Sequence, residues 1–229
     1  MNDDDTKEEQ YGRCMELYRN PGPASLGPMT NQTWYDDPRR LTFVLARYKF
    51  AAKMLSGKKR VLEVGCADAF GTRIVLQEVE SVCATDFDPV FVSDVHGRMD
   101  TRWKFDCVVH DILDGPMPEQ FDAAYALDVI EHIPVESEHQ FMRNIAASLS
   151  DAGVLIIGCP SLQSQTYASP LSKEGHVNCK DGLELKALMQ EYFDNVFLFS
   201  MNDEVVHTGY HPMAHYLFTV CAGKRSAEL

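Results

Sequence analysis

Carboxylate side chains recur at the ends of short apolar runs in this sequence. Asp86, Asp111 and Asp128 each follow such a run, and Glu63 lies near the end of an earlier one. In open α/β sheets, ligands bind beyond the carboxyl ends of the strands. We therefore expect these acids to surround one ligand. They suit a molecule with hydroxyls, an exocyclic amine and a positive charge, and they do not suit a polyphosphate.

A turn of small residues follows the first apolar run. The run over residues 61–64 stops at Gly65, Ala67 and Ala69 follow, and a segment that can be helical begins at Thr72. A strand, a tight turn and a helix start let backbone N–H groups approach a ligand closely. Glu63 should be buried beneath this turn, where a carboxylate needs a partner.

A second group of polar residues follows Asp128. If the chain turns helical there, Asp128, Glu131 and His132 share one helix face. His132, with Glu131 beside it, could remove a proton from a hydroxyl as a general base. Alternatively, these three residues and His176 could hold a divalent metal ion. In a purely structural role, His132 would bond a loop and Glu131 would be a solvated helix residue.

The elements that position these residues alternate between strand and helix patterns. Strands are predicted at residues 61–64, 81–86, 105–109, 121–127, 154–158, 195–200 and 216–221. Helical spacing covers residues 40–55 and 137–149, and Asp181 with Glu184 forms a capping box for a later helix. The sequence predicts an α/β, Rossmann-like fold: a seven-stranded, mostly parallel sheet with helices on both faces and an antiparallel last strand. Residues 1–38 are expected to form a flexible N-terminal arm or lid, and residues 39–229 a single domain.

Composition narrows the function classes. The chain has 229 residues, a formal net charge of −13 and a pI near 5.0, so we expect no nucleic-acid partner. Seven cysteines without a CxxC pair favour reduced thiols in a cytoplasmic protein. The polar N-terminus does not resemble a signal peptide, and no apolar run could span a bilayer, so we expect no membrane partner.

The ordered motifs resemble those of the class I S-adenosylmethionine (SAM) dependent methyltransferases. The resemblance runs from about residue 60 to residue 224, and its nearest group is the small-molecule O-methyltransferases of the ubiquinone-biosynthesis type. The matching segments are VLEVGCADAFG, ATDFD, FDCVVHDI, FDAAYALDVIEHIP, GVLIIGCPS and EGHVNCKDGLELKALMQEYF.

This resemblance implies a role for each matching residue. Asp86 would accept bonds from the ribose hydroxyls, Asp111 would contact the adenine amine, and Arg47 would close over the SAM carboxylate. The full set of implied cofactor contacts is Glu63, Gly65, Cys66, Ala67, Asp86, Phe87, Asp111, Ile112, Leu127, Asp128 and Arg47. In the family, the turn usually reads Gly-x-Gly-x-Gly. Here Ala67 and Ala69 replace the second and third glycines, which lowers the expected SAM affinity if the backbone needs positive φ.

The sequence thus predicts a SAM-dependent methyltransferase whose acceptor is a small molecule, methylated on a hydroxyl of a sugar or aromatic metabolite. A SAM-binding regulatory protein without catalysis is one alternative, since the two alanines depart from the family pattern. An NAD-dependent oxidoreductase is another. Against it, the third glycine of the dinucleotide fingerprint would fall at Phe70, which is too large for close helix packing.

Overall fold

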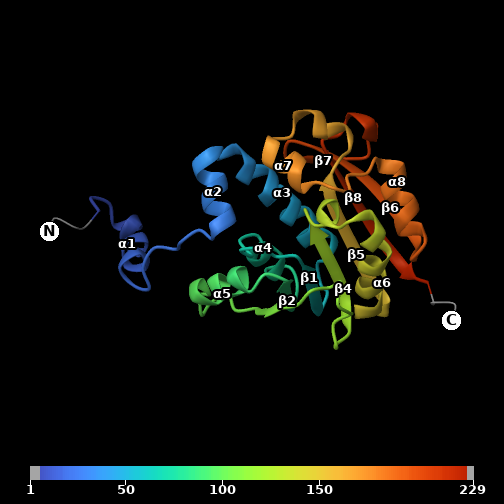
Figure 1. Ribbon diagram of the computed structural model, residues 1–229. Helices are drawn as coiled ribbons and strands as arrows, with labels where there is room; N and C mark the ends of the chain where they lie inside the picture. Colours follow the sequence, from blue (N-terminus) through green and yellow to red (C-terminus); the bar gives the residue numbers. More distant parts are fainter. Residues whose placement is uncertain (1–5, 226–229) are drawn as a thin grey trace.

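The computed structural model describes residues 6–225, which build one mixed sheet covered by helices (Figure 1). The order of the strands across the sheet is β3-β2-β1-β4-β5-β8-β6-β7. The strands are β1 (Arg60–Val64), β2 (Ser81–Asp86), β3 (Asp106–Val109), β4 (Phe121–Leu127), β5 (Leu149–Pro160), β6 (Phe193–Asn202), β7 (Val205–His207) and β8 (Tyr216–Lys224). Neighbouring strands from β3 to β5 pair in parallel, so their carboxyl ends share one edge.

The predicted count of seven strands is wrong by one, because β7 is an additional edge strand. It forms a hairpin with β6, in which Ser200 pairs with His207 and Asn202 pairs with Val205. Asp203 makes the turn with a φ of +50°. A strand of three residues is too short to show alternation in a sequence. The last strand, β8, is antiparallel to both β5 and β6, as predicted.

Side-chain alternation along the strands sorts the helices onto two faces. Val61 packs with α3 and α4, whereas its neighbour Leu62 packs with α6 and α8. The helices of the fold are α3 (Arg39–Met54), α4 (Thr72–Leu76), α5 (Pro89–Arg98), α6 (Glu138–Ser148), α7 (Pro170–Gly175) and α8 (Gly182–Gln190). The predicted capping box is present, since Asp181 accepts from the N–H of Glu184 and the Glu184 carboxylate accepts from the N–H of Asp181.

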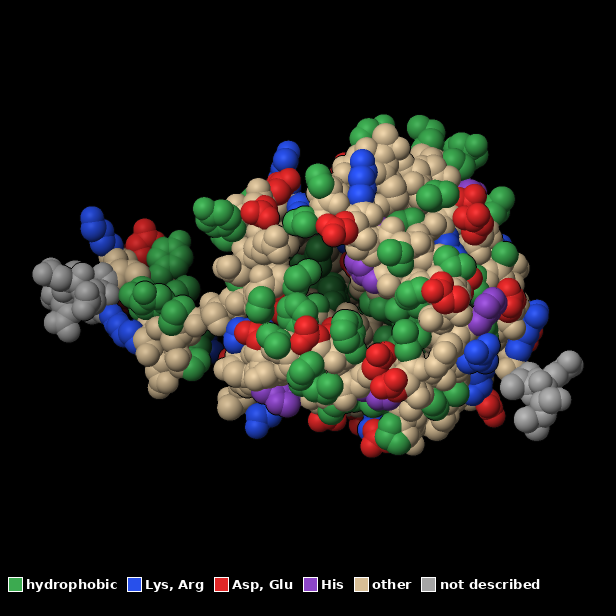
Figure 2. Space-filling view, viewed as in Figure 1, with side chains coloured by type: hydrophobic (Ala, Val, Ile, Leu, Met, Phe, Trp, Pro, Cys, Tyr) green, Lys and Arg blue, Asp and Glu red, His purple; other side chains and the backbone are tan. Residues whose placement is uncertain are grey.

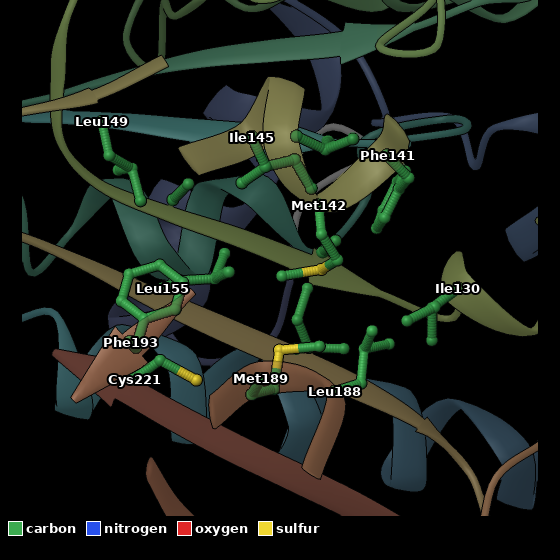
Figure 3. Close-up of a cluster of buried hydrophobic side chains, with 14 of the residues drawn as sticks. Ile130, Phe141, Met142, Ile145, Leu149, Leu155, Leu188, Met189, Phe193 and Cys221 are labelled. Carbon is green, nitrogen blue, oxygen red and sulfur yellow. The ribbon is translucent and has the colours of Figure 1, made fainter. Parts of the chain in front are cut away.

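The larger hydrophobic core lies between the sheet and the face covered by α6 and α8 (Figure 3). Phe141 and Ile145 of α6 meet Leu155 of β5 and Met189 of α8, all fully buried. Ile130, at the start of the loop after β4, also belongs to this core. The core therefore fixes the segment that carries Glu131 and His132.

The segment before residue 39 contains two helices, α1 (Gly12–Arg19) and α2 (Pro28–Asp36). In Figure 1, α1 stands away from the sheet, and α2 lies against the body of the fold beside α3. Over residues 6–225, none of the helices combines the length and the apolar character that crossing a membrane requires.

Candidate functional site

A cavity of about 910 Å³ opens above the carboxyl ends of β1, β4 and β5. Figure 2 shows this face hollowed beside the α2 segment, with hydrophobic side chains inside and a histidine at the edge. Nine of the predicted site residues line the cavity, namely Arg47, Gly65, Cys66, Ala67, Leu127, Asp128, Glu131, His132 and His176. Long-range folding thus brings together residues from α3, from the turn after β1, and from the loops that follow β4 and α7.

The turn after β1, residues 65–71, adopts the left-handed conformation that the glycine pattern of the family suggests. Gly65, Ala67 and Ala69 have φ values of +73°, +45° and +50°. A Cβ added to Gly65 would lie 2.5 Å from Cγ2 of Val129, so the turn approaches the loop after β4 closely. Ala67 and Ala69 therefore carry the strain that the sequence suggested, because alanine disfavours positive φ.

We expect the substitution Ala67→Gly to stabilise the protein by about 1 kcal/mol, because glycine removes the steric cost of left-handed backbone at a half-buried position. Urea denaturation of the variant and the wild type measures this difference. Ala24→Gly is the control, because Ala24 lies outside the helices and strands and has no positive φ, so this change should not stabilise. A less stable Ala67→Gly variant would contradict the assignment of strain to this position.

Glu63 lies beneath the turn, fully buried, and is held by residues of two helices. Its carboxylate accepts hydrogen bonds from the Tyr48 hydroxyl at 2.9 Å and the Thr72 hydroxyl at 2.6 Å. Burial raises the pKa of Glu63 to about 7, although the hydrogen bond from Thr72 opposes the shift. Glu63 therefore joins the turn to α3 and α4, and it does not line the cavity.

Asp86, at the end of β2, forms a hydrogen bond to the backbone of the turn. One carboxylate oxygen accepts the N–H of Ala67 at 2.8 Å, and the other accepts the N–H of Asp88 at 2.9 Å. Each carboxylate oxygen can accept a further bond, so these contacts leave capacity for a ligand hydroxyl.

Three other predicted cofactor residues also lie outside the lining of the cavity within the described chain. The Phe87 side chain is exposed, and Ile112 is buried in the core beside α6. Asp111 accepts the N–H of Leu113 at 2.8 Å. These residues follow β2 and β3.

Arg47 and Asp128 form an ion pair across the cavity. One guanidinium nitrogen, Nη1, lies 2.7 Å from both carboxylate oxygens of Asp128. The guanidinium stacks 3.9 Å from the centre of the Tyr216 ring, and its Nε atom is buried without a hydrogen-bond partner. The backbone of Asp128 is left-handed, with φ +59°. Asp128 is therefore directed toward α3 instead of sharing a helix face with Glu131.

Glu131, His132 and His176 converge at one end of the cavity. One potential ligand atom from each lies within 4.8 Å of the others. Glu131 and His132 belong to a 3₁₀ turn, residues 130–132, and His176 follows α7. The predicted metal set is thus gathered in part: these three residues meet, while Asp128 pairs with Arg47. We call the three the Glu131–His132–His176 cluster.

Hydrogen bonds fix the tautomers of both imidazoles. Nδ1 of His132 donates to the carbonyl oxygen of Gly175 at 2.9 Å, and Nδ1 of His176 donates to Oε1 of Gln165 at 2.9 Å. Both Nε2 atoms therefore keep a free lone pair in the neutral rings. This arrangement, in which Nδ1 is held by an oxygen acceptor and Nε2 is free, is the one found in histidine metal ligands.

The Glu131 carboxylate is the third member of the cluster, and it has no hydrogen-bond partner among the described residues. The residue is fully buried, and both of its oxygens are inaccessible. Burial, and then the neighbouring Asp128 carboxylate, raise the pKa of Glu131 well above its usual value. Burying a carboxylate charge without a partner destabilises the fold. Binding a proton or a cation at this side chain would remove that free-energy penalty.

The sequence reasoning missed several residues of the site. Tyr216 supports Arg47, Gln165 orients His176, and His215 lines the cavity. Asp68, within the turn, contacts α2.

Comparison with known families and proteins agrees with the predicted class. Residues 62–157 match the family model described as a methyltransferase domain. Two curated proteins of Mycobacterium tuberculosis, each described as a probable S-adenosylmethionine-dependent methyltransferase, are 26% identical over 102 residues. That match covers 44% of this chain and only 35% of the length of each relative.

Solved structures show the same fold. The N-methyltransferase NodS of Bradyrhizobium japonicum, in complex with S-adenosylhomocysteine (SAH), aligns with a TM-score of 0.59 at 17% identity, covering 83% of this chain and 90% of that one. A putative methyltransferase of Haloferax volcanii, in complex with the Trm112 activator, aligns with a TM-score of 0.63 at 11% identity, covering 88% and 100%. The chain therefore shares the fold of these solved methyltransferases, and its residues 62–157 match the methyltransferase domain model.

Proposed function

We propose that this protein transfers the methyl group of SAM to a hydroxyl oxygen of a small-molecule acceptor, with a divalent cation held by the Glu131–His132–His176 cluster. The observation that carries the oxygen acceptor and the cation is the buried Glu131 carboxylate, which has no partner and lies beside two free imidazole nitrogens. A neutral hydroxyl is a weak nucleophile, so its methylation needs a group that removes or withdraws the proton.

The residues after β1 fit the cofactor. Gly65 and Ala67 have left-handed backbone and face the cavity, so their peptide groups can approach a ligand closely. Asp86 fixes the N–H of Ala67, and Asp128 borders the same space. When bound, SAM supplies an electrophilic methyl group on a sulfonium. The chain's part is to hold the acceptor oxygen in line with that methyl group, since positioning alone can lower the barrier by roughly 7–11 kcal/mol.

The cluster fits a divalent cation by its donor set, one carboxylate and two neutral imidazoles. A cation held there would lower the pKa of a coordinated hydroxyl. Gln165 and the Gly175 carbonyl keep the two imidazoles oriented, and burial keeps water from the Glu131 oxygens. In the same cavity, Arg47 pairs with Asp128, and its positive charge opposes the rise in the pKa of Glu131 that burial and Asp128 cause.

A small acceptor is favoured by the size and charge of the site. The cavity of about 910 Å³ has to hold both cofactor and acceptor. The chain carries a net charge of −13, which disfavours an anionic polymer as acceptor. Sugar and phenol hydroxyls are the acceptors that we would screen first.

SAH should bind the wild type, and the variant Gly65→Ala should bind it at least about tenfold more weakly, because an added Cβ would meet Val129 and strain a residue at φ +73°. Isothermal titration calorimetry measures both affinities. Gly115→Ala is the matched control, since a Cβ there meets nothing within 4 Å. Binding of NADH in place of SAH would overturn the proposal. In a second step, transfer of labelled methyl from SAM to amines only would overturn the hydroxyl assignment.

A further inference from the structure

The helix α2 begins without a cap of its own. Its N-cap residue is Gly27, and no side chain of the helix accepts the free N–H groups of its first turn. Asp68, which lies 38 positions after Thr30 in the chain, supplies this function. Its Oδ2 accepts the N–H of Thr30 at 2.7 Å, and its Oδ1 accepts the Thr30 hydroxyl at 3.1 Å. A carboxylate at this place satisfies an orphan N–H and the positive end of the helix dipole.

The contact is close and buried on both sides. Thr30 is the buried residue of α2, and Asp68 is 5% exposed. A Cβ added to Gly27 would lie 2.3 Å from Cβ of Asp68 and 2.6 Å from Nη2 of Arg98, so only glycine permits this approach. Arg98 also donates to the carbonyl oxygen of Asp68 at 2.8 Å. The start of α2 is thus fitted to the turn.

Asp68 lies between Ala67 and Ala69, both at positive φ. The orientation of the Asp68 side chain therefore depends on the same strained backbone that borders the proposed cofactor site. The helix that Asp68 contacts, α2, forms one wall of the cavity with Met29, Gln32 and Thr33. The Asp68 side chain thus connects the turn at the proposed cofactor site to α2, the helix that walls the cavity.

We propose that Asp68 is a positioning residue that couples the docking of α2 to the cofactor-binding conformation of the turn. This inference rests on the proposed function, because it takes SAM or SAH as the ligand of the turn. A ligand that holds residues 65–69 in their left-handed conformation also holds the cap of α2 in place. By linkage, docked α2 strengthens ligand binding by the same factor. The α2 wall of the cavity would then be docked around the acceptor only when the cofactor is bound.

Hydrogen–deuterium exchange of residues 27–36, with and without SAH, tests the coupling. In the wild type, SAH should slow exchange in α2. In Asp68→Ala, exchange in α2 should be faster without ligand and insensitive to SAH, and the affinity for SAH should fall about fivefold, as for the loss of one helix cap. Asp68→Asn keeps an acceptor and should stay close to the wild type. Unchanged exchange in α6 and α8 checks that each variant is folded.

Gly27→Ala tests the same contact from the α2 side and leaves the sequence of the turn unchanged, because its added Cβ would meet Asp68. It should reproduce both the fast exchange and the weaker binding of SAH. Equal exchange of α2 in the wild type and Asp68→Ala would overturn the proposal, and so would full SAH affinity in Gly27→Ala when α2 is undocked. If SAH fails to bind the wild type, the proposed function fails. The ligand-free comparison of α2 then decides whether Asp68 holds the helix.

Discussion

At a free cation concentration of 100 times the dissociation constant, manganese or magnesium is expected to raise the melting temperature of the wild type by about 5–10 °C. The melting temperature of Glu131→Gln should not change. Binding to the native state at that ratio adds roughly 2.7 kcal/mol, and each kcal/mol corresponds to about 2–4 °C in a chain of this size. Glutamine removes the charge and one ligand oxygen while keeping the volume. Differential scanning fluorimetry across a cation titration, with EDTA as the blank, measures the shift.

The matched control is Glu136→Gln, which removes an exposed carboxylate five positions along the chain. It should respond to the cation like the wild type. Glu131→Gln should also be no less stable than the wild type in EDTA, because burial penalises the Glu131 charge. An equal cation response in both variants would place the cation elsewhere. No response in any protein would leave His132 as a general base without metal.

The second large effect is a fall in the free energy of unfolding with rising pH, which Glu63 causes. Its pKa is raised from 4.5 to about 7, so the folded protein holds a proton that the unfolded chain loses between these values. The stability contributed by this proton is fully present below pH 4.5 and is lost as the pH rises through 7. Over that interval the wild type should lose about 3 kcal/mol from this group, at 1.36 kcal/mol per pH unit.

Glu63→Gln should flatten this part of the profile, because glutamine stays neutral. Its amide oxygen can accept from one of the Tyr48 and Thr72 hydroxyls while its NH2 group donates to the other. Urea unfolding at several pH values between 4.5 and 8 gives the two curves. Glu80→Gln, at an exposed position before β2, serves as the control and should keep the wild-type slope. Parallel curves for Glu63→Gln and the wild type would show that Glu63 ionises normally in the fold.

Most of the fold could be predicted because its signals are local. The apolar runs of β1, β2, β4 and β5 and the capping box of α8 each lie within a few residues of sequence. The exception, β7, owes its existence to pairing with β6 at one edge of the sheet. Three residues carry no period, so only the neighbouring strand defines it.

The site was predictable in its residue types and less so in its contacts. Glu131, His132 and His176 meet, but Glu131 and His132 lie in a 3₁₀ turn instead of a helix, and Asp128 is not part of the group. Asp128 pairs instead with Arg47, which is 81 positions earlier in the chain. Two charges that distant in sequence meet only because α3 packs above the end of β4.

The sequence by itself determined the class of the domain: a parallel sheet, a small-residue turn after the first strand, and acids at the strand ends. Only the tertiary structure decided which of those acids face the cavity. Glu63 and Asp86 form hydrogen bonds beneath and beside the turn, while Asp128 lines the cavity and pairs with Arg47. The physical reason is that strand and helix periods depend on neighbours in sequence. The partner and solvation of a carboxylate depend on whatever segment packs against it.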